Sequence, residues 1–152
     1  MRALVGLALV VVAAACVAAA DTVAVLVFQD GRLNALALED QEKVGRLAVE
    51  MLASASYEAS SAVAEQAWLD TRLQPHLYVT FTPPRAVRFP FSTTGPATEQ
   101  EVQVDEMMMR FGAMWPQQIL VREQGRTRAF AKYGQREAQA LRDALRIGPT
   151  TR

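Results

Sequence analysis

Two dipeptides that end in glycine, each between two runs of strand-forming residues, constrain the fold more than any other feature of the chain. The runs are residues 22–29 and 32–38 around Asp30-Gly31, and residues 118–123 and 126–133 around Gln124-Gly125. A two-residue turn of type I′ needs positive φ at both central residues, and Gly adopts positive φ at no steric cost. The sequence therefore predicts two β-hairpins, one towards each end of a folded body.

Apolar residues recur at the helical period in two further segments, residues 40–56 and 135–147. The first stripe consists of Val44, Leu47, Ala48, Met51, Leu52 and Ala55, and the second of Ala138, Leu141, Ala144 and Leu145. Carboxylates at Glu39, Asp40 and Glu42 favour the start of the first helix, because they lie at the positive end of its dipole. We expect an amphipathic helix over each segment.

The middle of the chain carries one clear strand pattern, over residues 76–82. Alternate positions place Leu77, Val79 and Phe81 on one face, and His76, Tyr78 and Thr80 on the other. Pro83-Pro84 follows, and because proline donates no backbone hydrogen bond we expect the strand to end there. Residues 85–91 are then a separate partner strand, which Pro90 confines to a sheet edge.

Two other segments have weaker patterns. Residues 57–73 predict a short helix that Ser60-Ser61 could cap. Residues 101–111 predict a strand, with a helix as the alternative because methionine is a good helix former. Loops or turns are expected at residues 92–100 and 112–116.

These elements together predict an α+β fold. A helix with one apolar stripe must bury it, and an open antiparallel sheet of two or more hairpins offers the surface. We therefore expect a single small domain over residues 21–152, with two amphipathic helices packed on one face of the sheet. The apolar content of 51% and the balance of 16 basic against 16 acidic residues exclude a disordered chain. A single Cys excludes an intrachain disulfide framework and a Cys-rich zinc site.

The first 20 residues have the pattern of a secretory signal. Arg2 is a short basic region, residues 4–15 are an uncharged apolar run, and small residues end at Ala20 before Asp21. We expect cleavage after Ala20. The body of the protein would then act outside the cytoplasm, as a periplasmic, secreted or membrane-tethered domain.

Cys16 adds an alternative to simple cleavage. It follows three alanines, which resembles a bacterial lipobox, although Leu is usual where Ala13 stands. The resemblance implies lipidation of Cys16 and a membrane-anchored protein. A third alternative is an uncleaved anchor, since residues 3–20 approach the ~18 uncharged residues that one span needs. The membrane is expected as a partner only through such a signal or lipid anchor.

The order Pro116, strand, Gly125, strand, Gly134, helix resembles the C-terminal half of the thioredoxin fold. The resemblance covers about 32 of the 152 residues and implies, as an alternative fold, a thioredoxin-like domain. The Cys-x-x-Cys motif of that family is missing, so such a domain would be redox-inactive, because disulfide exchange needs two thiols.

No motif for a known chemistry stands out. Gly-rich phosphate loops and the G-x-S-x-G elbow are missing, and neither a metal nor a cofactor is predicted. A hydrolase would have to use the single histidine, His76, or an unassigned pair of carboxylates. The possible serine partners are Ser54, Ser56, Ser60, Ser61 and Ser92, and the loosely clustered acidic residues are Glu99, Glu101, Asp105 and Glu106.

Charge divides unevenly along the chain. Residues 21–109 hold 13 acidic and 6 basic residues, whereas residues 110–152 hold 3 acidic and 9 basic ones. The second predicted hairpin carries Arg122, Arg126, Arg128 and Lys132. These could form a patch for an anionic partner, or simply a solvated sheet face that charge protects against aggregation. Near-zero net charge disfavours nucleic acid.

The resulting interpretation is an exported or lipid-anchored binding module without catalysis, which meets an unknown protein or envelope component. An enzyme of hydrolase type that uses His76 or a carboxylate pair is the alternative.

Overall fold

A computed structural model describes residues 21–91, 96–110 and 118–145. Ten elements follow one another along the chain. They are β1 (Thr22–Gln29), β2 (Arg32–Ala35), α1 (Leu38–Ala53), β3 (Tyr57–Glu58), α2 (Ser61–Thr71), β4 (His76–Phe91), β5 (Thr98–Arg110), β6 (Ile119–Glu123), β7 (Arg126–Ala131) and α3 (Gln135–Ala144).

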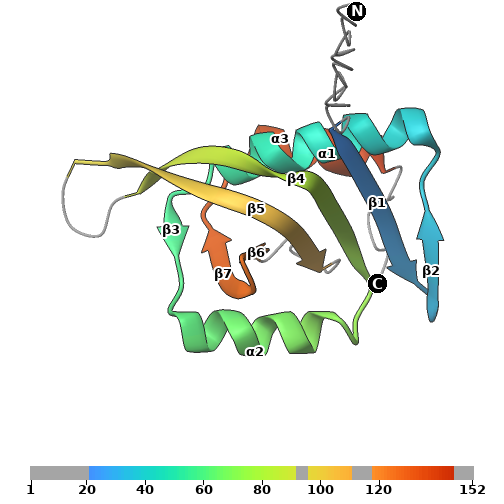
Figure 1. The fold of residues 1–152 in the computed structure, drawn as a ribbon, viewed down its shortest axis with the longest axis horizontal. Coiled ribbons are helices and arrows are strands. Elements are labelled where there is room, and N and C mark those ends of the chain that lie inside the picture. The colour runs from blue at the N-terminus through green and yellow to red at the C-terminus, as the bar shows by residue number, and fades with distance from the viewer. Residues whose placement is uncertain (1–20, 92–95, 111–117, 146–152) are drawn as a thin grey trace, which may run out of the picture.

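The seven strands form one antiparallel sheet in the order β2-β1-β4-β5-β6-β7-β3. Helices α1 and α3 pack side by side on one face, and α2 packs on the other (Figure 1). The α+β fold with an antiparallel sheet of hairpins is confirmed. The thioredoxin-like alternative is wrong, because β1 turns back into β2 instead of leading to a helix, and every strand pair is antiparallel.

Both predicted hairpins are present, and their turns have the backbone that the sequence requires. Asp30 and Gly31 have φ of 53° and 71°, and Gln124 and Gly125 have φ of 49° and 79°. A Cβ built on either glycine meets no atom within 4 Å, so these positions need Gly for backbone conformation and not for space.

A large apolar core fills the space between the sheet and the pair α1 and α3. From the helices it takes Val44, Ala48, Met51, Leu52, Ala138 and Leu141, and from the strands chiefly Val25, Leu77, Val79, Phe89, Met107, Met109 and Phe130. A smaller core lies under α2 and consists of Ala64, Trp68, Met108, Leu120 and Ala129. Strands β5, β6 and β7 therefore send alternate side chains into two cores of unequal size.

The expectation that Pro83-Pro84 ends a strand is wrong. β4 continues through both prolines to Phe91, so residues 85–91 are its second half and not a separate partner. A register shift between Thr80 and Arg85 on β4 absorbs the prolines, because the ladder to β5 is interrupted where no N–H can be donated. The second half pairs with β5 and not with β1, so its position at an edge, inferred from Pro90, is confirmed.

The same irregularity changes which side chains of β5 face the large core. Val102 and Val104 face it before the shift, and Met107 and Met109 face it afterwards. The segment is a strand and not a helix, as the first of the two alternatives predicted.

Three further expectations need correction. Helices lie on both faces of the sheet and not on one, because the short segment after Ser60 forms a full helix, α2, with its own buried side chains. Strand β3, which is only two residues long, was not expected. Residues 98–100, expected in a loop, belong to β5. The expected turn at residues 112–116 lies outside the described residues.

Helix α1 approaches the sheet closely at Gly45. A Cβ built there would lie 2.5 Å from Cγ1 of Val23 on β1, which is closer than atoms can pack. We predict that Gly45→Ala lowers the free energy of unfolding by about 1–3 kcal/mol, despite the better helix propensity of Ala, because overpacking outweighs it. Urea denaturation measures the change.

The double variant Val23→Ala with Gly45→Ala is the matched control, since it removes the clashing methyl group. It should recover part of the stability lost in the single Gly45→Ala variant. Equal stability of Gly45→Ala and the wild type would show that α1 can shift at no cost.

Candidate functional site

Helix α2 covers only part of its face of the sheet. It packs chiefly against β5, β6 and β7 and meets β4 through the edge contact of Trp68 with Tyr78, and no described helix lies over β1 and β2 on that side (Figure 1). A cleft of about 450 Å³ runs along the uncovered side of α2. Its walls are formed by Leu26, Phe28, Leu33, Trp68, Arg72, His76, Tyr78, Glu106, Met108 and Arg122.

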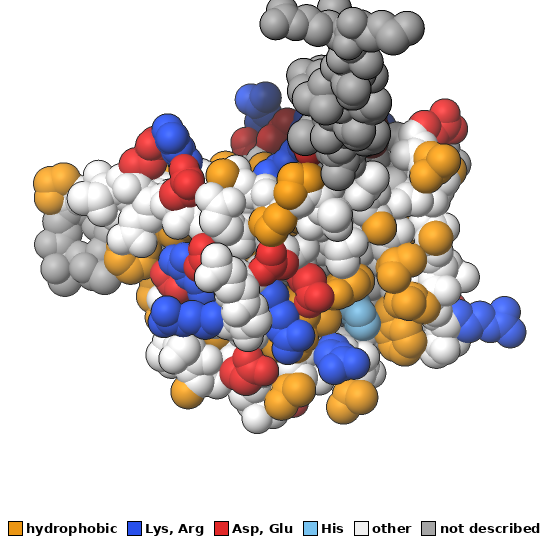
Figure 2. All heavy atoms as spheres, viewed as in Figure 1, with side chains coloured by type: hydrophobic (Ala, Val, Ile, Leu, Met, Phe, Trp, Pro, Cys, Tyr) orange, Lys and Arg blue, Asp and Glu red, His pale blue; other side chains and the backbone are white. Residues whose placement is uncertain are grey.

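The strand period of two explains why these side chains meet. Leu26 and Phe28 are alternate residues of β1, and His76 pairs with Phe28 across the sheet. Leu33 on β2 is the partner of Phe28 on the other side. The view in Figure 2 faces this region, with the single histidine in pale blue between apolar side chains on one side and charged ones on the other. The cleft therefore has an apolar half and a charged half.

His76 is fixed by two contacts. Its Nδ1 lies 2.7 Å from the carbonyl oxygen of Gln74, and its ring stacks on Phe28 with centroids 5.2 Å apart. Because a carbonyl oxygen only accepts, Nδ1 carries the proton and donates it. Nε2 is the ring nitrogen that remains to meet a ligand. The sequence-based placement of His76 and Tyr78 on one face of their strand, opposite Leu77 and Val79, is confirmed.

Tyr78 keeps its proton to high pH. Burial of the hydroxyl, together with the negative charge of Glu106 and a hydrogen bond to its carboxylate, raises the pKa of Tyr78 to about 12. Arg122 and Arg72 act in the opposite direction, since their charges stabilise a tyrosinate. The phenol is thus a hydrogen-bond donor in the cleft at any physiological pH.

Arg122 is held in place, but its guanidinium forms no hydrogen bond with the described residues. Its guanidinium carbon lies 4.4 Å from the centroid of the Trp68 ring. Its nitrogens approach Glu65 at 3.7 Å and Glu106 at 3.8 Å, beyond hydrogen-bond distance, and its buried Nε has no hydrogen-bond partner among the described residues. Because Nε is buried, the donors that a carboxylate or phosphate could reach are those of the two terminal nitrogens, which make no hydrogen bond within the described chain.

Arg128, on the neighbouring strand β7, differs from Arg122 because its guanidinium is hydrogen-bonded within the fold. It donates to both carboxylate oxygens of Glu58, at 2.7 and 3.0 Å, and to Glu123 at 3.2 Å. It also lies over the rings of Phe89 and Phe130, on the face of the large core. Its charge is therefore used within the fold.

The four basic residues of the second hairpin do not converge. Arg122 faces α2, whereas Arg128 faces the opposite side of the sheet. Arg126 is exposed at the start of β7, and Lys132 lies over Tyr57 beyond the end of that strand. Of these four, only Arg122 lines the cleft, and there it is joined by Arg72 of the turn after α2.

The described residues do not bring a nucleophile to His76, since no described serine lines the cleft. Ser54 donates to the carbonyl of Met51 and accepts from the backbone of Gly134, and Ser56 donates to the carbonyl of Lys132. Ser60 and Ser61 lie at the start of α2, and Ser92 lies outside the described residues. Glu106 is the one carboxylate among the side chains that line the cleft.

The other acidic residues form ion pairs or face solvent. Glu99 and Glu101 both pair with Arg88, and Asp105 accepts from the backbone of Gln124. Across the described ranges, no group of three or more His, Cys, Asp or Glu side chains is placed to hold a metal ion.

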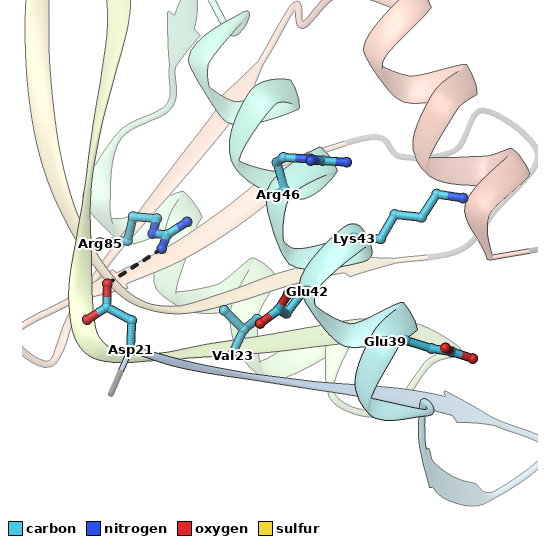
Figure 3. Close-up of a pocket in the computed structure, with 7 residues that line it drawn as sticks. All are labelled: Asp21, Val23, Glu39, Glu42, Lys43, Arg46 and Arg85. Atoms are coloured by element: carbon cyan, nitrogen blue, oxygen red, sulfur yellow. Dashed lines mark ion pairs between the residues drawn. The ribbon is translucent and has the colours of Figure 1, made fainter. Parts of the chain in front are cut away.

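A second pocket, of about 430 Å³, lies where β1 meets α1 (Figure 3). Its walls are formed by Asp21, Val23, Glu39, Glu42, Lys43, Arg46 and Arg85. Asp21 and Arg85 form a loose ion pair at 4.0 Å, whereas Glu39, Lys43 and Arg46 extend away from them. The acidic and basic side chains of this pocket are equal in number and point in different directions, so they do not form a binding site for one charged group. The cleft beside α2 is therefore the stronger candidate.

Cys16 and Ala20, the expected lipidation and cleavage positions, lie outside the described residues. Within the parts of the chain that the structure describes, no helix is both long and apolar enough to cross a membrane. Neither a protein-family model, nor a curated protein, nor a solved structure matches this chain significantly. Function must therefore be argued from the cleft itself.

The sequence indicated His76 as a possible catalytic residue, Arg122 as part of a basic patch and Glu106 as one of several clustered acidic residues. It did not predict that they share one site with Tyr78, Trp68 and Arg72. One signal was available, because Trp68 and Arg72 are four residues apart and so share a helix face. Glu106 could not be assigned, since its orientation depends on the register shift between β4 and β5.

The two arginines should differ in their effect on stability. We predict that Arg128→Gln lowers the free energy of unfolding by about 2–3 kcal/mol, because it leaves the half-buried carboxylates of Glu58 and Glu123 without their partner. Arg122→Gln should cost less than about 1 kcal/mol, because its ion pairs are long. Chemical denaturation of both variants checks this, and an equal loss would contradict the assignment of Arg122 as unsaturated.

Stability should also depend on the ionisation of Tyr78. The folded pKa of about 12 exceeds the unfolded value of about 10, so the stabilisation is complete below pH 10 and is lost as the pH rises towards 12. We predict that the unfolding free energy falls less steeply over this range in Tyr78→Phe than in the wild type. Denaturation at pH 9, 10 and 11 measures the slopes, and parallel slopes would contradict the prediction.

Proposed function

We propose that the protein is an exported, non-catalytic binding module, and that the cleft beside α2 is its binding site for a protein partner. The observation that carries the proposal is the unsaturated guanidinium of Arg122 at the edge of an apolar sheet face. The side chain of Arg122 is 30% exposed, and its two terminal nitrogens lie beyond hydrogen-bond distance from Glu65 and Glu106, so they can donate to a bound anionic group.

The apolar half of the cleft supports the same proposal. Leu33 is 56% exposed, and Leu26 and Phe28 are only half-buried, although all three face the same side of the sheet. The solvated face of an antiparallel sheet is normally polar, so contiguous apolar side chains there indicate an interaction surface. Binding would bury them.

The setting outside the cytoplasm is part of the proposal and rests on the N-terminal sequence. A basic residue, an apolar run and small residues before Asp21 support a signal, and Cys16 after three alanines supports a lipid anchor as the alternative. The partner would then be an envelope or secreted protein.

Site-specific photo-crosslinking in the native cells tests the binding site. A photoreactive residue in place of Leu33, on the cleft, should trap a discrete partner protein. The matched control places the same photoreactive residue at Leu38, which is 82% exposed at the start of α1. This control should trap no partner protein. Equal crosslinking from both positions, or none from Leu33, would overturn the proposal.

A panel of hydrolase substrates on the purified protein tests the absence of catalysis. We expect no turnover above background. Turnover that Arg122→Gln or His76→Ala abolishes would make the cleft an active site instead.

A further inference from the structure

The structure leaves room for one more helix beside α2. Among the residues that the structure describes, the opposite face of the sheet carries two helices, α1 and α3, whereas this face carries α2 alone (Figure 1). Packed helices lie about 8–10 Å apart, and neighbouring strands about 4.8 Å apart. A second helix next to α2, which packs on β5 to β7, would therefore lie over β4 and β1, where the cleft is.

The chemistry of the cleft selects the side chains of such a helix. One wall is apolar, with Leu26, Phe28 and Leu33, and the other is charged, with the two cations Arg72 and Arg122 against the single carboxylate of Glu106. The helix must therefore present an apolar stripe to the sheet and a carboxylate to the arginines on its α2 side. Arg122 offers that carboxylate two terminal nitrogens that lie beyond hydrogen-bond distance from Glu65 and Glu106, on a guanidinium that stacks on Trp68.

An extended segment fits less well on this face. The uncovered face presents side chains and not the backbone N–H and C=O groups of a strand edge. An extended backbone laid across Leu26 and Phe28 would leave its own polar groups facing apolar surface without partners, at a cost for each. A helix satisfies its backbone internally and buries only its stripe.

We propose that the cleft receives an amphipathic α-helix of the partner protein, which lies alongside α2 with an acidic side chain on Arg122. The inference rests on the proposed binding function and specifies the partner element. A helix about as long as α2, which has 11 residues, would cover the open face. Its arrival would give this face the two-helix cover that the other face already has.

Synthetic helical peptides test the inference directly. The probe is a fluorescein-labelled 16-residue peptide with leucines at the i, i+3, i+4 and i+7 spacing and glutamates along one flank. A second peptide replaces the glutamates by lysines, and a third rearranges the leucines so that no stripe forms. Fluorescence anisotropy against the purified full chain measures the three dissociation constants.

The acidic amphipathic peptide should bind best, and Arg122→Gln should weaken it about tenfold, as expected for the loss of a charge-assisted hydrogen-bond pair. Arg126→Gln, an exposed arginine of the same hairpin outside the cleft, is the matched control and should leave the dissociation constant unchanged. Because Arg122 packs on Trp68, circular dichroism checks that its variant is folded. The exposed Arg72→Gln provides a second test that should weaken the acidic peptide without affecting the fold.

Four outcomes would overturn the inference. The acidic and lysine peptides could bind equally, the rearranged peptide could bind as well as the striped one, or sodium decanoate could occupy the cleft in place of peptide. Sedimentation could instead reveal a self-associated chain that Leu33→Ser dissociates, so that a second copy covers the face. If crosslinking from Leu33 still trapped a partner protein, only the helix would be wrong and the binding function would stand.

Discussion

The alternation of side chains along β4 is the constraint on which both faces of the sheet depend. In its first half β4 lies between β1 and β5, so its register determines what the centre of the sheet presents on either side. Leu77 and Val79 enter the large core, while His76 and Tyr78 enter the cleft. A slip of one residue would exchange these sets and bury a histidine and a phenol against α1. The cleft is therefore built by the same register that builds the core.

The described helices cover the two faces of the sheet unequally. Gly45 allows α1 to lie directly against Val23, and α3 packs beside α1, so that face carries the large core. On the other face the bulky Trp68 anchors α2 over Met108, Leu120 and Ala129. Nothing in the described chain covers Leu26 and Phe28 beyond it. The domain thus has one large core and one smaller core, and Leu26 and Phe28, which line the candidate site, lie outside both.

Local patterns were sufficient to predict most of the fold. Glycine at a two-residue turn and an apolar stripe at helical spacing are properties of neighbouring residues, so both hairpins, α1 and α3 were predictable. Continuation of β4 through Pro83-Pro84 was not, because it requires a partner strand whose ladder shifts at the same place. The side of the sheet on which α2 packs was not predictable either, since Ala64 and Trp68 only define an apolar face and not what it meets. For the same reason the site could be predicted only in part, as single residues and not as a cleft.

Arg122 and Arg128 show why charge counted along a sequence is a poor guide to a binding surface. They lie on the same hairpin, six positions apart, and the strand–turn–strand geometry sends them to opposite sides of the sheet. Arg128 meets Glu58, which β3 brings from 70 positions away, and its donors are taken up at hydrogen-bond distance. Arg122 meets Glu65 and Glu106 too far away for hydrogen bonds, because stacking on Trp68 determines where its guanidinium lies. What separates a structural arginine from one available to a partner is therefore the distance at which the fold supplies its carboxylates, and this distance is a property of tertiary packing alone.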